Sequence, residues 1–218
     1  MNMKKIKYLA ISMLLILMSC NSSRITSSWK ASDLQPKKFN KILVLGLIQE
    51  KDRSLREQME QQLLANLQKN GYNAICACDE YGPKAFENMT EKEAIDKLAN
   101  SGIDAVLTVV LLDKTRERYY IPGHIAYSPY AIYRNRFWHY YTTMYDRIYM
   151  PGYYQVETKY FWESNLYDMQ TKELLYSVQT DSFDPSSSES LARDYGQLIV
   201  RNIVKNKVLE TQTQLKAF

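Results

Sequence analysis

The first part of the chain alternates between continuous apolar runs and a four-residue apolar period. FNKILVLGLI, at residues 39–48, is a continuous apolar run, as expected of a strand buried on both faces. The following segment, residues 53–70, predicts a helix with four apolar side chains along one face: Leu55, Met59, Leu63 and Leu67. Gly71 then supplies a helix C-cap, and NAICAC predicts a short second strand.

The middle of the chain predicts a second helix and the most apolar strand. Thr90 and Glu93 form a capping box, and Gly102 ends the helix that they start. Between them lies an apolar stripe: Ala94, Ile95, Leu98 and Ala99. IDAVLTVVLLD, at residues 103–113, follows and is expected to lie at the centre of the sheet.

Farther along, the apolar period changes to two. Residues 156–166 place Trp162 and Leu166 on one face and Lys159 and Glu163 on the other, as in a half-exposed antiparallel strand. DMQTKE predicts a turn, LLYSVQTDSF its partner strand, and Asp184-Pro185 the start of a last helix.

These elements predict an α/β fold with a single mixed sheet in the order β-α-β-α-β-β-β-α. The three strands linked by helices should run parallel with right-handed crossovers, and a hairpin should extend the sheet. A long Tyr-rich insertion separates the third and fourth strands. The predicted domain covers residues 39–209, with the insertion at 115–152 and a C-terminal tail at 210–218.

The N-terminus predicts export and a lipid anchor. Lys4, Lys5 and Lys7 precede an apolar run at residues 8–18, which is too short to span a bilayer as a helix and is typical of a signal peptide. The ending Leu-Met-Ser-Cys resembles a lipobox, which predicts cleavage after residue 19 and diacylglyceryl and palmitate groups on Cys20. The alternative is an ordinary signal peptide in which Cys20 is incidental.

The segment after Cys20 predicts where the protein is located in the cell, and cleavage before Cys20 changes the net charge of the chain. Residues 20–38 have little apolar content and no period, which predicts a flexible tether, and the absence of an acidic cluster favours the periplasmic face of the outer membrane. Loss of residues 1–19 removes three lysines and no acid. The 28 basic and 24 acidic side chains thereby become 25 and 24, a net charge of +1. This balance argues against nucleic acid as a partner.

The insertion is the most unusual segment. It holds nine of the 18 tyrosines and five arginines against two acidic residues, with Pro-Gly pairs near both ends. Tyrosine and arginine are favoured in interfaces, so the insertion predicts a surface for an envelope protein or a glycan. The alternative is a loop whose aromatic side chains cover the sheet. The candidate binding residues are Tyr119, Tyr127, Tyr130, Tyr133, Arg134, Arg136, Trp138, Tyr140, Tyr141, Tyr145 and Tyr149.

Reactive motifs are scarce, so we expect no enzyme, no cofactor and no metal. Nucleophile-elbow, zinc-protease and phosphate-loop patterns are absent from the sequence, and the two histidines, His124 and His139, lie in the insertion without matched ligands. Cys76 and Cys78 would point to one side of a strand, as a metal site, a redox pair or two small buried residues, and we favour the last. The functional alternative is a hydrolase of envelope polymers with carboxylates assembled in space.

The chain resembles a group of uncharacterised Gram-negative envelope lipoproteins. The resemblance rests on the Ser-Ser-Trp at residues 27–29, on KILVLGL and GIDAVLTVVLLD, and on the hairpin LYDMQTKELLYSVQTDSFDPSSSE. More distantly, the chain is similar to the periplasmic domains of the curli secretion lipoprotein and of the lipoprotein that activates a penicillin-binding protein. The resemblance implies the fold and the envelope address, and it transfers no catalytic or binding residue.

Overall fold

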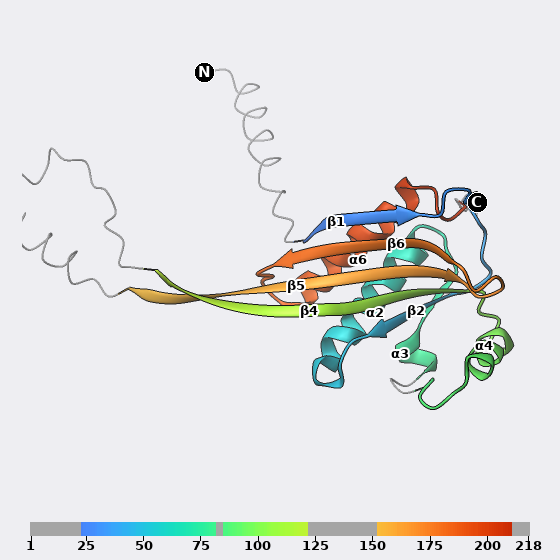
Figure 1. The fold of residues 1–218 in the computed structure, drawn as a ribbon, viewed down its shortest axis with the longest axis horizontal. Helices are drawn as coiled ribbons and strands as arrows, with labels where there is room; N and C mark the ends of the chain where they lie inside the picture. The colour runs from blue at the N-terminus through green and yellow to red at the C-terminus, as the bar shows by residue number, and fades with distance from the viewer. Residues whose placement is uncertain (1–22, 82–84, 122–151, 211–218) are drawn as a thin grey trace, which may run out of the picture. The chain divides into compact units, whose positions relative to one another are not determined.

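The structure is a computed structural model, and it describes residues 23–81, 85–121 and 152–210 (Figure 1). The chain divides into two compact units, one of Met1–Lys114 with Lys159–Phe218 and the other of Thr115–Thr158. The strands are β1 (Ser23–Lys30), β2 (Ile42–Leu47), β3 (Ala74–Cys76), β4 (Ala105–Ile121), β5 (Tyr153–Asp168) and β6 (Leu174–Phe183). The helices are η1 (Glu50–Asp52), α2 (Arg53–Lys69), α3 (Ala77–Glu80), α4 (Glu91–Asn100) and α6 (Ser188–Lys205).

The strands form one mixed sheet in the order β1-β6-β5-β4-β2-β3. β2 pairs in parallel with β3 and β4, whereas β5 and β6 form an antiparallel hairpin. The predicted single mixed sheet is therefore confirmed, and so is the interior position of the apolar strand that begins at Ala105. The capping box of Thr90 and Glu93 and the positive φ angles of Gly71 and Gly102 also agree with the predicted helix ends.

The predicted order of elements lacked the first strand. Ser23–Lys30 was expected within the tether, but it forms β1 and pairs antiparallel with β6 at the edge of the sheet. The hydroxyls of Ser23 and Ser182 are 2.7 Å apart, and Arg24 forms an ion pair with Asp181 at 3.1 Å. Most of the β1 side chains are exposed, so the strand is held by backbone pairing and carries no apolar period.

A second difference concerns NAICAC. β3 ends at Cys76, and the chain turns at once into the short helix α3. The Cα atoms of Cys76 and Cys78 are 5.2 Å apart, closer than the roughly 6.7 Å between alternate residues of a strand, and a disulfide joins the two sulfurs. The prediction of two separate buried thiols was wrong because the extended conformation that it assumed ends at Cys76.

The two faces of the sheet are covered unequally. α2 and α6 lie behind the strands in Figure 1 and enclose the larger core, which contains Leu63, Val109, Trp162 and Tyr195. α3 and α4 cover only the part of the other face around Leu43 and Val106, where Leu98 of α4 belongs to the same buried cluster. We call these the closed face and the open face. The open face is where side chains remain available for binding.

Candidate functional site

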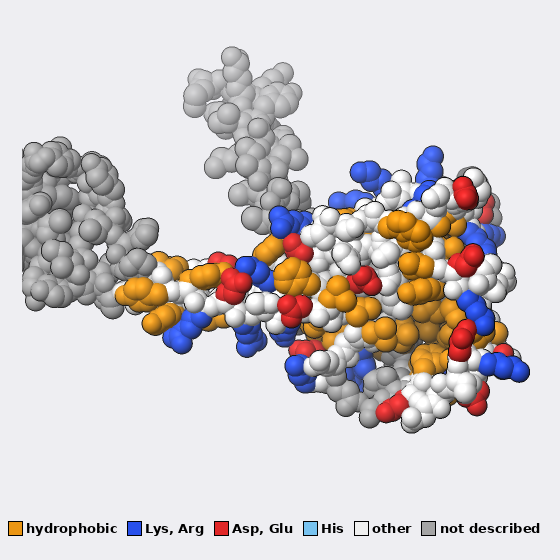
Figure 2. Space-filling view, viewed as in Figure 1, with side chains coloured by type: hydrophobic (Ala, Val, Ile, Leu, Met, Phe, Trp, Pro, Cys, Tyr) orange, Lys and Arg blue, Asp and Glu red, His pale blue; other side chains and the backbone are white. Residues whose placement is uncertain are grey.

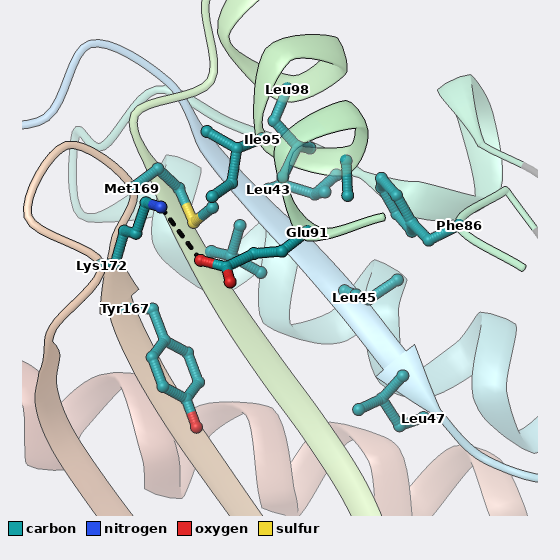
Figure 3. A pocket seen from close by; sticks show the side chains of 12 residues that line it. Leu43, Leu45, Leu47, Phe86, Glu91, Ile95, Leu98, Tyr167, Met169 and Lys172 are labelled. Carbon is teal, nitrogen blue, oxygen red and sulfur yellow. Dashed lines mark hydrogen bonds and ion pairs between the residues drawn. The ribbon is translucent and has the colours of Figure 1, made fainter. Parts of the chain in front are cut away.

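An apolar groove lies between α4 and the open face of the sheet (Figure 3). Its floor comes from alternate residues of β2. Leu43 is fully buried, Leu45 is half-buried, and Leu47, at the end of the strand, is 52% exposed. The alternation follows from the pleat, which turns Ile42 and Val44 toward the closed face. Burial therefore decreases along β2 as the strand runs out from under α4.

One wall of the groove is the inner face of α4 and the segment before it. The predicted apolar stripe supplies Ala94, Ile95 and Leu98, and Phe86 packs against the same buried cluster as Leu98. Tyr167 at the end of β5 and Met169 in the following turn form the opposite wall. The cavity measures about 420 Å³. This volume lies within the range of about 300–1,000 Å³ that is usual for ligand pockets.

A single ion pair provides the charge in the groove. Lys172, in the turn between β5 and β6, donates to Glu91 on α4 at 3.0 Å, and both side chains are largely exposed (Figure 3). The turn is anchored beneath this pair, because the Met169 N–H donates to the Asp104 carbonyl at 2.9 Å. An exposed pair of this kind contributes little to stability, so a ligand could displace it at small cost.

The chemistry of the groove favours binding. Its other lining residues are Leu, Val, Ile, Ala, Met, Phe and Tyr, which gain free energy by removing apolar surface from water. Glu91 is the one carboxylate among the lining residues, and glycoside hydrolysis requires two. The groove therefore suits an apolar chain or apolar side chains of a partner, and it gives no support to the hydrolase alternative.

Hydrophobic side chains continue beyond the groove along the open face. Figure 2 shows them gathered over the strands next to α4. Val110 pairs with Leu47 across the sheet and shares this face, and Leu112 follows two residues later with 52% of its surface exposed. The sequence already contained this signal, since continuous apolar runs put apolar side chains on both faces of β2 and β4.

The unit Thr115–Thr158 carries a cluster of exposed tyrosines. In its described parts, the rings of Tyr120 and Tyr154 are 5.2 Å apart, and the Arg118 guanidinium stacks 3.9 Å from the Tyr154 centroid. Tyr120, Tyr153 and Tyr154 are each 56–60% exposed, and the Tyr119 hydroxyl donates to Glu117. We call Arg118, Tyr119, Tyr120, Tyr153 and Tyr154 the tyrosine cluster. It joins aromatic surface to a planar cation, the combination that interfaces favour.

The candidate residues of the sequence analysis fall unevenly on the structure. Tyr119 lies in β4 and is exposed. Cys20 and the other ten candidates, from Tyr127 to Tyr149, lie outside the described residues. The tyrosine cluster adds Arg118, Tyr120, Tyr153 and Tyr154, which the sequence analysis did not single out.

The disulfide of Cys76 and Cys78 lies against a buried carboxylate. Glu60 on α2 is 2% exposed, and its Oε2 atom is 3.2 Å from the Cys76 Sγ atom. Among the described residues, Glu60, Cys76 and Cys78 form a group whose carboxylate oxygen and sulfur atoms lie close enough together to hold a metal ion. Because the two sulfurs are bonded to each other, the cluster offers no thiolate and is a disulfide site.

In the described part of the chain, no helix combines the length and apolarity needed to cross a membrane.

Comparisons with known proteins give only a distant likeness. The chain matches no family model and no protein of curated description. Among solved structures, the PelC dodecamer from Paraburkholderia phytofirmans shares 13% identity, with 87% of this chain and 98% of that chain covered and a TM-score of 0.41. Lipoprotein GNA1162 from Neisseria meningitidis shares 17% identity, with 76% and 98% covered and a TM-score of 0.42. At these values the likeness carries no functional argument, which therefore rests on this chain's own residues.

Proposed function

We propose that the chain is a non-enzymatic envelope lipoprotein, anchored by lipid on Cys20 at the periplasmic face of the outer membrane, that binds an envelope protein or a glycan. The anchor rests on the signal-peptide pattern and on the Leu-Met-Ser-Cys sequence. The binding role rests on one observation, the tyrosine cluster, in which Arg118 stacks on Tyr154 beside the exposed ring of Tyr120.

The composition of the insertion extends this argument. The other ten candidate residues, from Tyr127 to Tyr149, continue the same chemistry along the chain. Tyrosine provides large contact area with a hydroxyl at its tip, and arginine provides planar donors that stack on rings and pair with carboxylates. Both properties suit a protein interface or the faces of sugar rings.

The apolar groove favours a second candidate function, the binding of an apolar ligand. The groove of about 420 Å³ beside α4 would accept an acyl chain or a few apolar side chains of a partner. In this case Leu47, rather than the tyrosine cluster, would lie nearest the bound molecule.

Site-specific photocrosslinking in living cells separates the two candidates. A photoreactive amino acid is placed in the full chain at Tyr153, at Leu47, or at Arg201, an exposed position on α6 that serves as the control. The proposal expects a crosslinked adduct from Tyr153 and none from Arg201. A second change, Arg118→Ala, should weaken that adduct several-fold because it removes the stacked cation.

The outcomes are distinct. An adduct from Leu47 alone would transfer the function to the groove, and equal adducts from all three positions would contradict a specific surface. The anchor is checked in the same cells, because Cys20→Ala should leave the chain uncleaved or in the soluble fraction. Recovery of that variant in the outer membrane at the parent level would contradict the lipid anchor.

A further inference from the structure

The disulfide between Cys76 and Cys78 is held by three structural elements. β3 delivers Cys76, α3 carries Cys78, and α2 brings Glu60 against the Cys76 sulfur at 3.2 Å. The Cys78 N–H donates to Cys76 Sγ at 3.2 Å and also to the Glu60 carboxylate. The cluster is therefore organised around a carboxylate that contacts one particular sulfur of the pair.

Glu60 is an unusual residue for this position. Its side chain is almost fully buried, and its Oε1 atom accepts a hydrogen bond from the Gly46 N–H at 2.7 Å. Gly46 leaves room for this contact, because a Cβ atom there would lie 2.6 Å from Arg56 Cγ and 2.8 Å from Glu60 Oε1 and would displace these side chains. A buried carboxylate costs free energy unless it is paired or hydrogen-bonded. An apolar residue would fill the space more cheaply if packing were the only requirement.

The environment also prepares Glu60 to exchange a proton. Burial raises the pKa of Glu60, although the Gly46 N–H and the Arg56 guanidinium act in the opposite direction. A carboxyl group with a raised pKa can hold a proton closer to neutral pH and pass it to a neighbouring atom. The neighbouring atom here is the Cys76 sulfur.

The two sulfurs differ in access. Cys76 is fully buried, whereas Cys78 is only partly buried. Cys78 is the more exposed residue of the two, so a thiolate from outside would attack the Cys78 sulfur, and the electrons of the broken bond would remain on Cys76, beside Glu60. The more accessible sulfur is therefore the one that would be attacked, and the sulfur beside the proton donor is the one that would leave. Thiol–disulfide exchange needs one sulfur in each of these roles.

We propose that Cys76, Cys78 and Glu60 form a thiol–disulfide exchange site that reacts with a dithiol. A thiolate of the dithiol attacks Cys78 Sγ, the bond between the two cysteine sulfurs breaks, and Cys76 Sγ takes a proton from Glu60. The second thiolate of the dithiol then attacks the first sulfur of the dithiol, which is now bonded to Cys78. The bond to Cys78 breaks, and the released Cys78 thiolate takes a proton from water. The dithiol loses two electrons and becomes a disulfide, and the cystine of the chain becomes two thiols.

The reverse reaction uses the same groups. Cys78 thiolate attacks a substrate disulfide, and Cys76 gives its proton to Glu60 as it attacks Cys78 Sγ and closes the bond again. Disulfides persist in oxidising compartments such as the bacterial periplasm, which agrees with the proposed location of the chain. The inference does not depend on the tyrosine cluster or on the apolar groove.

The test uses the full chain with Cys20→Ser, so that Cys76 and Cys78 are its only cysteines. Dithiothreitol serves as the dithiol, and alkylation followed by mass spectrometry counts the free thiols over time. Without reductant the chain should take no alkyl group, and after reduction it should take two. Two alkylated cysteines in untreated chain would overturn the proposal.

The role of Glu60 is tested by the pH profile of reduction. Glu60→Gln should slow reduction about tenfold or more and remove the inflection that the carboxyl group introduces. Glu173→Gln removes an exposed carboxylate in the turn between β5 and β6, away from Glu60, and is the control that should keep the parent rate and profile. Equal rates and profiles for Glu60→Gln and the parent would refute proton transfer by Glu60.

Single cysteine variants keep the proposal testable if Glu60→Gln does not fold. Cys76→Ser leaves the accessible Cys78 and should form a mixed disulfide with oxidised glutathione, whereas Cys78→Ser leaves the buried Cys76 and should form little. The opposite preference would overturn the assignment of the attacked sulfur. Thermal melting of each variant shows whether the comparison is made on folded chain.

Discussion

The two faces of the sheet carry similar side chains but have different surroundings. On the closed face, α2 and α6, of 17 and 18 residues, cover the strands and leave Val109 and Trp162 without exposed surface. On the open face, the ten-residue helix α4 and the four-residue helix α3 cover part of β2 and β4, and Leu47 and Leu112 remain half exposed. Helix length, rather than strand composition, therefore decides where apolar surface is left for binding.

The largest expected effect comes from placing a charge on each face of the same strand. Val109→Asp would bury an unpaired carboxylate on the closed face and should cost several kcal/mol, enough to unfold a domain of ordinary stability. Leu112→Asp, three residues along β4 on the open face, should change the free energy of unfolding by less than about 1 kcal/mol. Urea unfolding followed by circular dichroism measures both.

The contrast between these variants is the point of the experiment. Similar losses in Val109→Asp and Leu112→Asp would mean that the two faces are buried alike. A stable Val109→Asp variant would refute the assignment of the core. Leu111, which the sequence also places toward the closed face, is only partly buried and should respond between the two.

A smaller loss of stability is expected from breaking either of two ion pairs, one buried and one exposed. Asp168 is 1% exposed, pairs with Lys37, and accepts the Gln170 N–H at 2.8 Å. Asp168→Asn should therefore lose about 2 kcal/mol. Glu91→Gln breaks the exposed pair with Lys172 and should lose less than about 0.5 kcal/mol.

The pH dependence of Asp168 has a definite sign. Burial acts to raise the pKa of Asp168, but Lys37 and the backbone N–H groups outweigh it, and the folded pKa is lowered. The folded chain then binds a proton less readily than the unfolded chain, so the stabilisation is present above about pH 4 and is lost as pH falls through the folded pKa. The difference between the parent and Asp168→Asn should be constant from pH 5 to 7, on this approximate scale, and shrink below about pH 4. A difference that grows toward acid would contradict this account.

The smallest expected change in the free energy of unfolding distinguishes two tyrosines on opposite sides of the sheet. Tyr195 of α6 packs in the core of the closed face, and Tyr167 lines the groove on the open face. The hydroxyl of Tyr195 is fully buried, 2.8 Å from that of Ser164, and Tyr195→Phe should cost about 1 kcal/mol because it leaves Ser164 unpaired. Tyr167→Phe, in the wall of the groove, should stay within about 0.5 kcal/mol of the parent. Equal losses in the two variants would show that the groove is as tightly constrained as the core.

Much of the fold follows from local patterns in the chain. The four-residue period from Leu55 to Leu67, the capping box at Thr90 and the alternation around Trp162 each report a structure fixed by neighbouring residues. Such patterns arise because one side of a helix or strand must be apolar when it packs, whatever it packs against. Most of the element order, the parallel pairing around β2 and the central place of β4 could therefore be predicted from local patterns.

Three features of the molecule depend on contacts between segments that lie far apart in the chain. β1 exists because β6 offers it an edge, and its own residues carry no apolar period. The disulfide of Cys76 and Cys78 forms because the chain turns at the end of β3, where α2 brings Glu60 against the sulfur from 16 residues away. The groove exists because α4 is shorter than the strands that it covers. Edge pairing, turns and incomplete cover depend on elements distant in sequence, so a local pattern cannot reveal them.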